Sequence, residues 1–311
     1  MKEVLRSLFQ AAPEPFDMAL LDRRMSVLLE AMNVERMLAA KAIAMSIRAS
    51  CEPRRLEDVE FKCYSQFGDD GIIQYLVHML GIELRTFVEF GVEDYRESNT
   101  RFLLLNDNWR GLVIDGSGEN VARIKSDPIF WRQDLTAVAA FIDTGNINRL
   151  IDEAGFSGEL GILSIDIDGN DYWVWESIET VRPLVVICEY NSVFGPDRAI
   201  SIPYDPAFFR GDVHHSYLYY GASLPALVKL GKRKGYAFVG SNSAGNNAYF
   251  VRSDRLGRIS EITAAEGHVS SKFRESRDAE GRFSYLSGSA RLEAMRGLPV
   301  VDVTTGRVEA L

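Results

Sequence analysis

The stretch that most constrains the fold is a short apolar run that ends in an acid and a glycine, at residues 85–93. A run of this length, followed by a polar segment that could open a helix, is typical of the first strand and turn of a Rossmann-like domain. Gly91 lets the backbone turn tightly, and Glu89 stands at the carboxyl end of the strand, where open α/β sheets bind ligands. The run therefore predicts a ligand site at this turn, although a strand that ends in Glu-x-Gly is also often a plain βα turn.

The same turn indicates which ligand it can hold. Gly91 is followed by no second or third glycine in residues 92–95. The pyrophosphate of a dinucleotide needs bare backbone close to it and a helix N-terminus facing it. Glu93 and Asp94 would repel that charge, whereas S-adenosylmethionine is a cation without a phosphate and tolerates acids there. The turn therefore favours S-adenosylmethionine over NAD.

Apolar runs of strand length recur along the chain and alternate with helical segments. Those after the first are residues 111–114, 160–165, 183–188, 236–239 and 248–251. Strands that alternate with helices imply a mainly parallel sheet with both faces covered. The last two runs are separated by a turn rich in Asn and Gly, which predicts a closing hairpin.

Composition excludes several classes of protein. The 311 residues carry a net charge of −9, which argues against nucleic-acid and membrane-surface partners. Cys51, Cys63 and Cys188 form neither a disulfide framework nor a zinc pattern. The N-terminus has no signal-peptide core and no stretch approaches a membrane span, so a cytoplasmic location is expected.

The ends of the chain differ from its middle, which predicts three parts. Residues 1–58 read as a helical appendage, because apolar positions recur at helical spacing there. This appendage would pack on the domain, form a homo-oligomer or act as a lid, and we favour packing or oligomerisation over a lid. Residues 59–255 form the central domain, and residues 256–311 are an extension, basic in places, on the side of the acceptor.

Two further acids follow predicted strands. Asp115, followed by Gly116, ends the second run 24 positions after Gly91, near the place where an acid grips the ribose hydroxyls of an adenosine ligand. Its two carboxylate oxygens can accept both hydroxyl hydrogens. Asp134 is expected after a short third strand, where it could accept from the adenine amino group. A surface turn is an equally good interpretation of Asp134.

An ordered set of motifs resembles the FkbM-type methyltransferases. The matching segments are Tyr64 to Gly71, Phe87 to Gly91, Ser98 to Thr100, and Trp109 to Asp115. The resemblance covers roughly residues 61–251. It implies a Rossmann-like class I fold, with a seven-stranded, mainly parallel sheet and helices on both faces, and S-adenosylmethionine-dependent O-methylation of sugars or polyketides. By matching positions it implies that the cofactor contacts are Gln66, Glu89, Gly91, Asn99, Asp115 and Asp134.

Two strand ends carry a candidate metal site. Asp166 and Asp168 stand two apart after one run, and Glu189 and Asn191 stand two apart after the next, so each pair would point to one face. These strands are neighbours in the class I order. Hard oxygen ligands suit Mg²⁺, Mn²⁺ or Ca²⁺. Alternatively, Asp168 caps the following helix and Asn191 is a turn residue.

The predicted chemistry needs help with a proton. A sugar hydroxyl is a poor nucleophile while protonated, so a base or a metal must assist. The candidates are Asp166 and the adjacent His214 and His215, since histidine titrates near neutral pH. The alternative is that the histidines are surface loop residues.

The sequence thus predicts an S-adenosylmethionine-dependent O-methyltransferase that acts on a hydroxyl of a saccharide or glycosylated natural product, assisted by a divalent cation such as Mg²⁺. One rival is an NAD-dependent Rossmann oxidoreductase, which the missing glycines disfavour. The other is a non-catalytic interaction protein on a methyltransferase fold.

Overall fold

The computed structural model describes residues 18–50 and 52–311. Cys51 and the part of the predicted N-terminal helices before residue 18 lie outside the described residues. The chain divides into two compact units, residues 1–42 and 43–311. Helix α2 (Met18–Arg48) supplies the described part of the first unit and continues into the second. A search of the described helices for a stretch that could cross a bilayer finds none.

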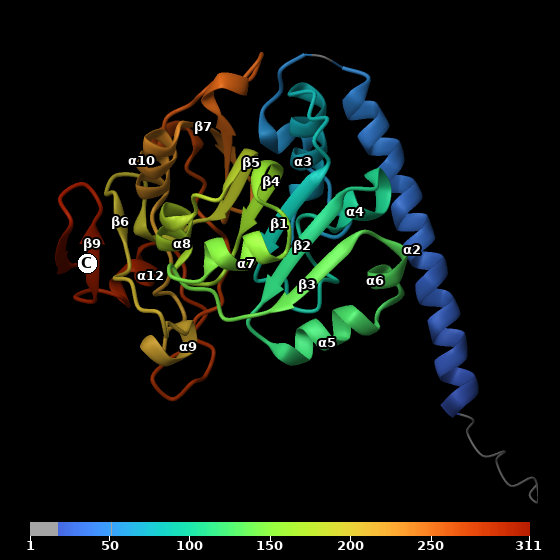
Figure 1. The fold of residues 1–311 in the computed structure, drawn as a ribbon. Coiled ribbons are helices and arrows are strands. Elements are labelled where there is room, and N and C mark those ends of the chain that lie inside the picture. Colours follow the sequence, from blue (N-terminus) through green and yellow to red (C-terminus); the bar gives the residue numbers. More distant parts are fainter. Residues whose placement is uncertain (1–17, 51) are drawn as a thin grey trace, which may run out of the picture. The chain divides into compact units, whose positions relative to one another are not determined.

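The second unit is built on a seven-stranded sheet in the order β3-β2-β1-β4-β5-β8-β7 (Figure 1). The strands are β1 Thr86–Phe90, β2 Arg110–Asp115, β3 Leu135–Ala139, β4 Gly158–Ile165, β5 Val181–Glu189, β7 Tyr236–Ser241 and β8 Asn247–Arg252. The first five are parallel, and β8 runs antiparallel to both β5 and β7. This order, with the last strand inserted beside β5, is that of the Rossmann-like class I methyltransferase fold. The predicted fold class is confirmed.

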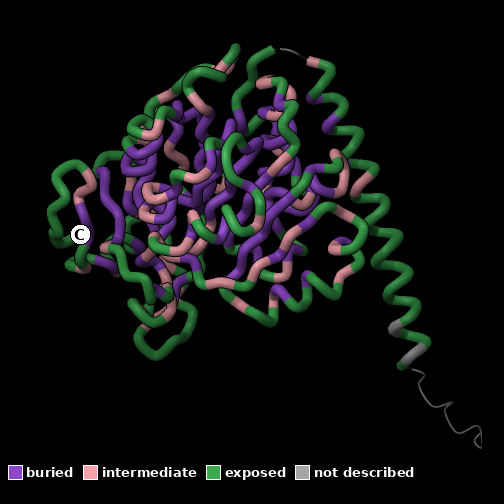
Figure 2. The backbone as a smooth tube through the Cα atoms, in the orientation of Figure 1, coloured by how far each residue is buried: buried purple, intermediate pink, exposed green. Residues whose placement is uncertain are grey.

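Helices cover both faces of this sheet. They are α3 Asp69–Met79, α4 Arg101–Asp107, α5 Gly118–Ser126, α6 Pro128–Arg132, α7 Ile147–Glu153, α8 Asp171–Ser177 and α10 Leu224–Lys234. On one face Val88 and Leu163 share a core with Ile147, Trp175 and Leu227 of α7, α8 and α10. Tyr249 of β8 points to the other face, where its hydroxyl donates to Asp69 of α3. Figure 2 shows the buried backbone running through the sheet between these layers.

Local sequence signals explain where several helices begin and end. The Ser117 hydroxyl accepts from the N–H of Asn120 at the start of α5, and Ser223 caps α10 in the same way. Gly235 ends α10 in the left-handed conformation, which glycine adopts without strain. Asn108 ends α4 in that conformation, one of the few non-glycine types that tolerate it.

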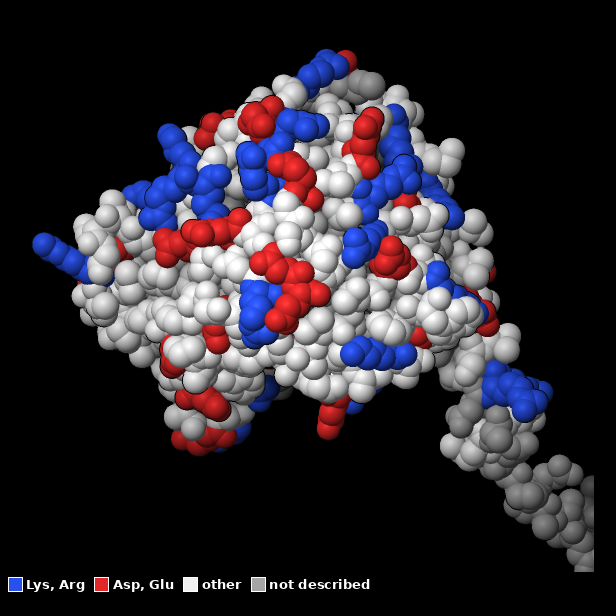
Figure 3. Space-filling view, viewed as in Figure 1, with Lys and Arg blue, Asp and Glu red and all other residues white. Residues whose placement is uncertain are grey.

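The extension folds back on the loop that follows β5. A three-stranded sheet has the order β10-β9-β6, with β6 Ile200–Ser201, β9 Pro299–Asp302 and β10 Arg307–Ala310. The short elements of the two segments are η2 Ser192–Phe194, α9 Arg210–Val213, α11 Ala264–Gly267 and α12 Ser289–Glu293. Two more, η1 Leu56–Val59 and η3 Ser253–Arg255, flank the sheet segment in sequence. On the face that Figure 3 shows, basic and acidic side chains are interspersed.

Candidate active site

The turn after β1 is fixed by close contacts with β2 and with the end of β4. Gly91 has a φ of +68°, and a Cβ there would collide with the backbone carbonyl of Asp166. Its N–H donates to the carbonyl of Ile114 in β2, over 3.0 Å. Only glycine fits this close approach. The turn therefore brings the carboxyl ends of β1, β2 and β4 together at one place.

Glu89 joins β1 to the beginning of α4. Its carboxylate is 4% exposed and accepts from the Ser98 hydroxyl at 2.6 Å and from the Asn99 N–H at 2.8 Å. The N–H and hydroxyl of Thr100 donate to it as well. Burial raises the pKa of Glu89, against the effect of these donors. The Asn99 amide donates to the Ser164 hydroxyl, so this polar cluster also contacts β4. Cofactor contacts by Glu89 and Asn99 stay predictions.

Asp115 fastens the same turn to β2. Its carboxylate accepts from the N–H of Glu93 at 2.8 Å and from the N–H of Ser117 at 2.8 Å. Gly116 follows, and a Cβ there would lie 3.4 Å from the ring of Phe141, a side chain that is 54% exposed. An exposed ring beside this turn offers a flat ligand a stacking surface. The sequence analysis missed Phe141, whose only signal was an aromatic residue just beyond β3.

Asp134 lies at the opposite edge of the sheet, so its predicted place beside adenine is wrong. The third strand follows Asp134 rather than preceding it, because β3 begins at Leu135. The Asp134 carbonyl accepts from the N–H of Gly111 near the start of β2, and its exposed carboxylate is 3.9 Å from Arg110. Gln66 is exposed, and its carbonyl accepts from Lys62. A cofactor contact by Gln66 stays a prediction.

The motif that follows Gln66 is built into the sheet. One oxygen of Asp70 accepts from the N–H groups of Cys63, Tyr64 and Ser65. Asp69 accepts from the Asn247 amide at 3.0 Å and from the hydroxyl of Tyr249. Because Asn247 of β8 stands opposite Glu189 of β5, the motif lies near the carboxyl end of β5.

Arg101, the first residue of α4, was also missed. Its guanidinium lies over the rings of Tyr64 and Tyr95, 5.2 and 5.7 Å from their centroids, and donates to the Tyr95 carbonyl at 2.7 Å. It forms no ion pair with any residue that the structure describes, and its buried Nε has no hydrogen-bond partner. An unpaired guanidinium next to the Glu89 cluster can bind a ligand carboxylate.

Three carboxylates converge where β4 and β5 end. Oxygens of Asp166, Asp171 and Glu189 all lie within 4.8 Å of one another; we call these residues the acid cluster. Asp171 is held in place by the N–H groups of Ile167 and Gly169, at 2.9 and 3.0 Å. Glu189 is 8% exposed, and its Oε2 is buried without a partner among the described residues. A buried carboxylate oxygen without a hydrogen-bond donor is stabilised when it carries a proton or contacts a cation.

The raised pKa values of the acid cluster also indicate that it binds a proton or a cation. Burial raises the pKa of Asp171 to about 6. Burial first, and then repulsion by neighbouring carboxylates, raises the pKa values of Asp166 and Glu189 well above their ordinary values. Charged carboxylates this close are unfavourable unless a positive charge lies among them.

Two of the four predicted metal ligands are not members of the acid cluster. β4 ends at Ile165, so residues 166–170 form a turn and the two-residue alternation of a strand does not apply to them. Asp168 has a φ of +55° and pairs with Arg210 at 2.8 Å, outside the acid cluster. The fully buried Asn191 donates its amide to the carbonyls of Leu218 and Tyr220. Asp171, which was not among the predicted ligands, completes the acid cluster instead.

Arg210 brings positive charge toward the acid cluster. Its guanidinium lies 4.0 Å from the centroid of the Tyr220 ring, and its Nε donates to the Tyr217 carbonyl at 2.5 Å. Besides pairing with Asp168, it acts electrostatically on Asp166 and Glu189 and favours their charged forms. One signal could have found it, because Arg210 is the only Lys or Arg in residues 199–228.

The two histidines lie in the loop after α9. A ring nitrogen of His214 is 2.7 Å from the Ser216 hydroxyl, and the His214 and His215 rings are 4.2 Å apart. Burial and the neighbouring His215 lower the pKa of His214. Within the described chain, neither histidine forms a hydrogen bond with the acid cluster. Their roles as bases stay predictions.

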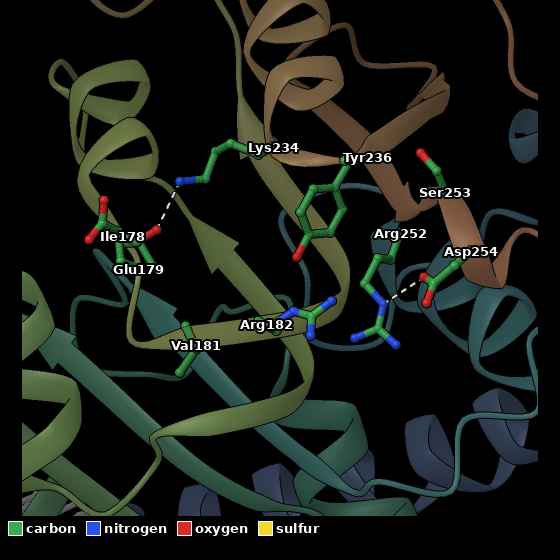
Figure 4. Close-up of a pocket in the computed structure, with 10 residues that line it drawn as sticks. Ile178, Glu179, Val181, Arg182, Lys234, Tyr236, Arg252, Ser253 and Asp254 are labelled. Carbon is green, nitrogen blue, oxygen red and sulfur yellow. Dashed lines mark hydrogen bonds and ion pairs between the residues drawn. The ribbon is translucent and has the colours of Figure 1, made fainter.

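A cavity of about 540 Å³ lies at the other edge of the sheet (Figure 4). Val181 and Tyr236, which begin β5 and β7, line it together with Arg252 at the end of β8. Its basic groups have partners: Lys234 donates to the carbonyl of Ile178, and Arg252 pairs with Asp254 (Figure 4). This cavity is separate from the acid cluster, which stands at the carboxyl end of β5.

Comparison with known proteins closes the description of the site. No protein-family model and no curated protein sequence matches the chain. Among solved structures, an O-methyltransferase from Bacillus cereus in complex with SAH is 14% identical, with a TM-score of 0.41 over 70% of this chain and 90% of that one. The N-terminal domain of EvdMO1 with SAH bound is 11% identical, with a TM-score of 0.38 over 70% of this chain and 94% of that one.

Proposed function

We propose that this chain is an S-adenosylmethionine-dependent O-methyltransferase whose acid cluster binds a divalent cation. The observation that carries the proposal is the junction of two features at one edge of the sheet. The single-glycine turn, with Asp115 and Phe141, suits an adenosine ligand that lacks a pyrophosphate. The acid cluster lies after β4, whose end contacts that turn through Asp166 and Gly91.

The donor site is proposed to span the ends of β1, β2 and β3. Asp115 keeps acceptor capacity for a ribose hydroxyl at Oδ2, which accepts from the Glu93 N–H, whereas Oδ1 already accepts from Ser117 and Asn120. The Phe141 ring would pack against adenine, and Arg101 would bind the carboxylate of the methionine group. The sulfonium would then lie toward Asp166. Close to negative charge, a sulfonium is stabilised without any phosphate contact.

The chemical step needs an oriented hydroxyl that can lose its proton. Holding the acceptor oxygen in line with the methyl group supplies much of the rate. Asp166, Asp171 and Glu189 would hold Mg²⁺ or a similar hard cation, because all three offer carboxylate oxygens and Glu189 Oε2 has no partner. Such a cation lowers the pKa of a bound hydroxyl. Without it, Asp166 or Glu189 is the nearest base.

The acceptor is proposed to be a saccharide or a glycosylated natural product. The motif resemblance supports this class, and so do the aromatic side chains of the loop that carries Arg210. Tyr204 and Phe209 of that loop are 36% and 60% exposed. Aromatic rings beside polar groups are typical of small-ligand sites.

The proposal is tested first by titration calorimetry of the full chain with S-adenosylhomocysteine and with NAD. We expect saturable binding of S-adenosylhomocysteine and none of NAD. The variant Phe141→Ala should weaken S-adenosylhomocysteine binding roughly tenfold, as the loss of one stacking contact worth about 1–1.5 kcal/mol. Trp131→Ala, which removes another exposed ring, is the control and should bind normally. Binding of NAD in preference to S-adenosylhomocysteine would support the oxidoreductase, and binding of neither would support an interaction protein.

A further inference from the structure

Exposed aromatic side chains are concentrated in two segments of the chain. Of the seven such side chains among the described residues, two are Trp131 and Phe141. The other five are Tyr204, Phe209, Phe273, Phe283 and Tyr285. They come from only two segments, the loop at α9 and the extension, which lie side by side because the Arg277 N–H donates to the Ser216 carbonyl (Figure 1). A gathering of exposed apolar side chains marks a binding surface.

Within this surface, two guanidinium groups lie against three aromatic rings. The Arg277 guanidinium lies between two rings, 4.8 Å from the centroid of Tyr217 and 4.7 Å from that of Phe283. Phe283 stacks on Tyr285 with centroids 5.6 Å apart, and Arg274 lies 5.7 Å from the Tyr285 centroid. We call these five residues the Arg–aromatic ladder. Cation–π contacts hold its members in order.

The two arginines of the ladder have no acidic partner. Neither Arg274 nor Arg277 forms an ion pair in the part of the chain that the structure describes. The nearby Asp278 and Glu280 both pair with Arg282 instead. The Arg277 guanidinium donates to the Gly281 carbonyl, and its buried Nε has no partner among the described residues. Arg274 donates from Nε and Nη2 to the Tyr285 carbonyl, both over 3.2 Å. In a chain with a net charge of −9, two guanidiniums of one ladder that have no acidic partner among the described residues indicate an anionic ligand.

The ladder is connected to the proposed reaction centre through one residue. Tyr217, at its end, accepts from Arg210 through its carbonyl, and Arg210 pairs with Asp168 in the turn after β4. A ligand lying on the ladder would therefore reach the acid cluster from the side of Arg210. The ladder can position an acceptor without itself taking part in the methyl transfer.

We propose that the Arg–aromatic ladder is the acceptor subsite and that the acceptor is an acidic saccharide. The inference rests on the proposed function. Phe283 and Tyr285 pack against the apolar face of a sugar ring, and Arg274 and Arg277 bind its carboxylate or phosphate. The ladder thus selects anionic over neutral sugars.

The test uses saturation-transfer NMR on the full chain loaded with S-adenosylhomocysteine. The probes are methyl β-D-glucuronide and methyl β-D-glucoside, which differ only in the carboxylate, and the pair glucose 6-phosphate and glucose. We expect at least one anionic sugar to bind about tenfold more tightly than its neutral partner, as one charge-assisted contact of about 1.4 kcal/mol gives. Which pair shows the difference separates a carboxylate from a phosphate.

The variants assign the effect to the ladder. Arg274→Gln and Arg277→Gln should reduce the affinity for the anionic sugar to that for its neutral partner, and Phe283→Ala should weaken the binding of both. Arg307→Gln removes an exposed charge on β10 and should change neither. Unchanged melting temperature and unchanged S-adenosylhomocysteine affinity show that a variant is folded. Arg277 contacts backbone and rings. If Arg277→Gln does not meet these two controls, the exposed Arg274 provides the test.

Equal binding of each pair, or unchanged selectivity in Arg274→Gln, overturns the ladder as an acceptor subsite. That result leaves the proposed function intact if S-adenosylhomocysteine still binds. Absence of S-adenosylhomocysteine binding would instead refute the proposed function itself.

Discussion

Arg101 is the residue that we propose to bind the carboxylate of the methionine group. Arg101→Gln should weaken S-adenosylhomocysteine binding about tenfold, because a charge-assisted contact to the ligand carboxylate is lost. Binding of 5′-methylthioadenosine, which lacks the amino-acid group, should not change. Titration calorimetry with both ligands measures the difference. Arg96→Gln, which removes an exposed arginine paired with Asp94, is the control. Equal losses for both ligands would show that Arg101 acts on the fold and not on the carboxylate.

At this scale the sequence located the right region but not all the right side chains. Glu89, Gly91 and Asp115 stand at the strand ends where they were expected, since apolar runs that end in acids are local signals. The sequence could not show which of Asp168 and Asp171 belongs to the acid cluster, because this depends on where β4 ends and the turn begins. Arg210 reaches the acid cluster only through tertiary contacts, which no local pattern records.

Among the elements, the turn after β1 has the strictest requirement. Gly91→Ala should destabilise the protein by about 3 kcal/mol or more, because it adds a positive-φ cost to a collision with the Asp166 carbonyl. Gly81→Ala is a matched control: its φ is +57°, but nothing lies within 4 Å of the added Cβ, so the cost should be about 1–2 kcal/mol. Urea unfolding measures both. Equal costs would mean that the turn shifts to accept a side chain.

The strands show why some boundaries were predictable and others were not. β1, β4 and β5 are buried apolar runs, so their places could be read from hydrophobicity. β3 was placed before Asp134 because the apolar residues of α6 lie just there, and a short run does not distinguish a helix from a strand. β6 has only two residues, and its pairing with β9 is a contact between distant segments. No periodicity could have shown it.

For the molecule as a whole, the open question with the clearest test is its state of assembly. In α2, apolar side chains recur at three- and four-residue intervals, namely Met18, Leu21, Met25, Leu28 and Met32. This is the spacing of a helix–helix seam. Light scattering should show a homo-oligomer for the full chain and a monomer for residues 43–311. Affinity for S-adenosylhomocysteine should stay within about twofold, since the residues proposed to contact it all lie in that unit. A truncated chain that still associates would place the interface within residues 43–311, and a lost affinity would favour a lid.

The site can form only after the residues from β8 onward, including the extension, have folded. Asp69 near the beginning of this unit is held by Tyr249, 180 residues later, and Ser192 is held by Ser271. Contacts between such distant residues carry a high loop-closure entropy and form late in folding. During synthesis on the ribosome, the nascent chain would therefore leave β5 without its neighbour β8 until residues 247–252 have emerged. We expect the pairing of β8 with β5 to form in a slow final folding phase.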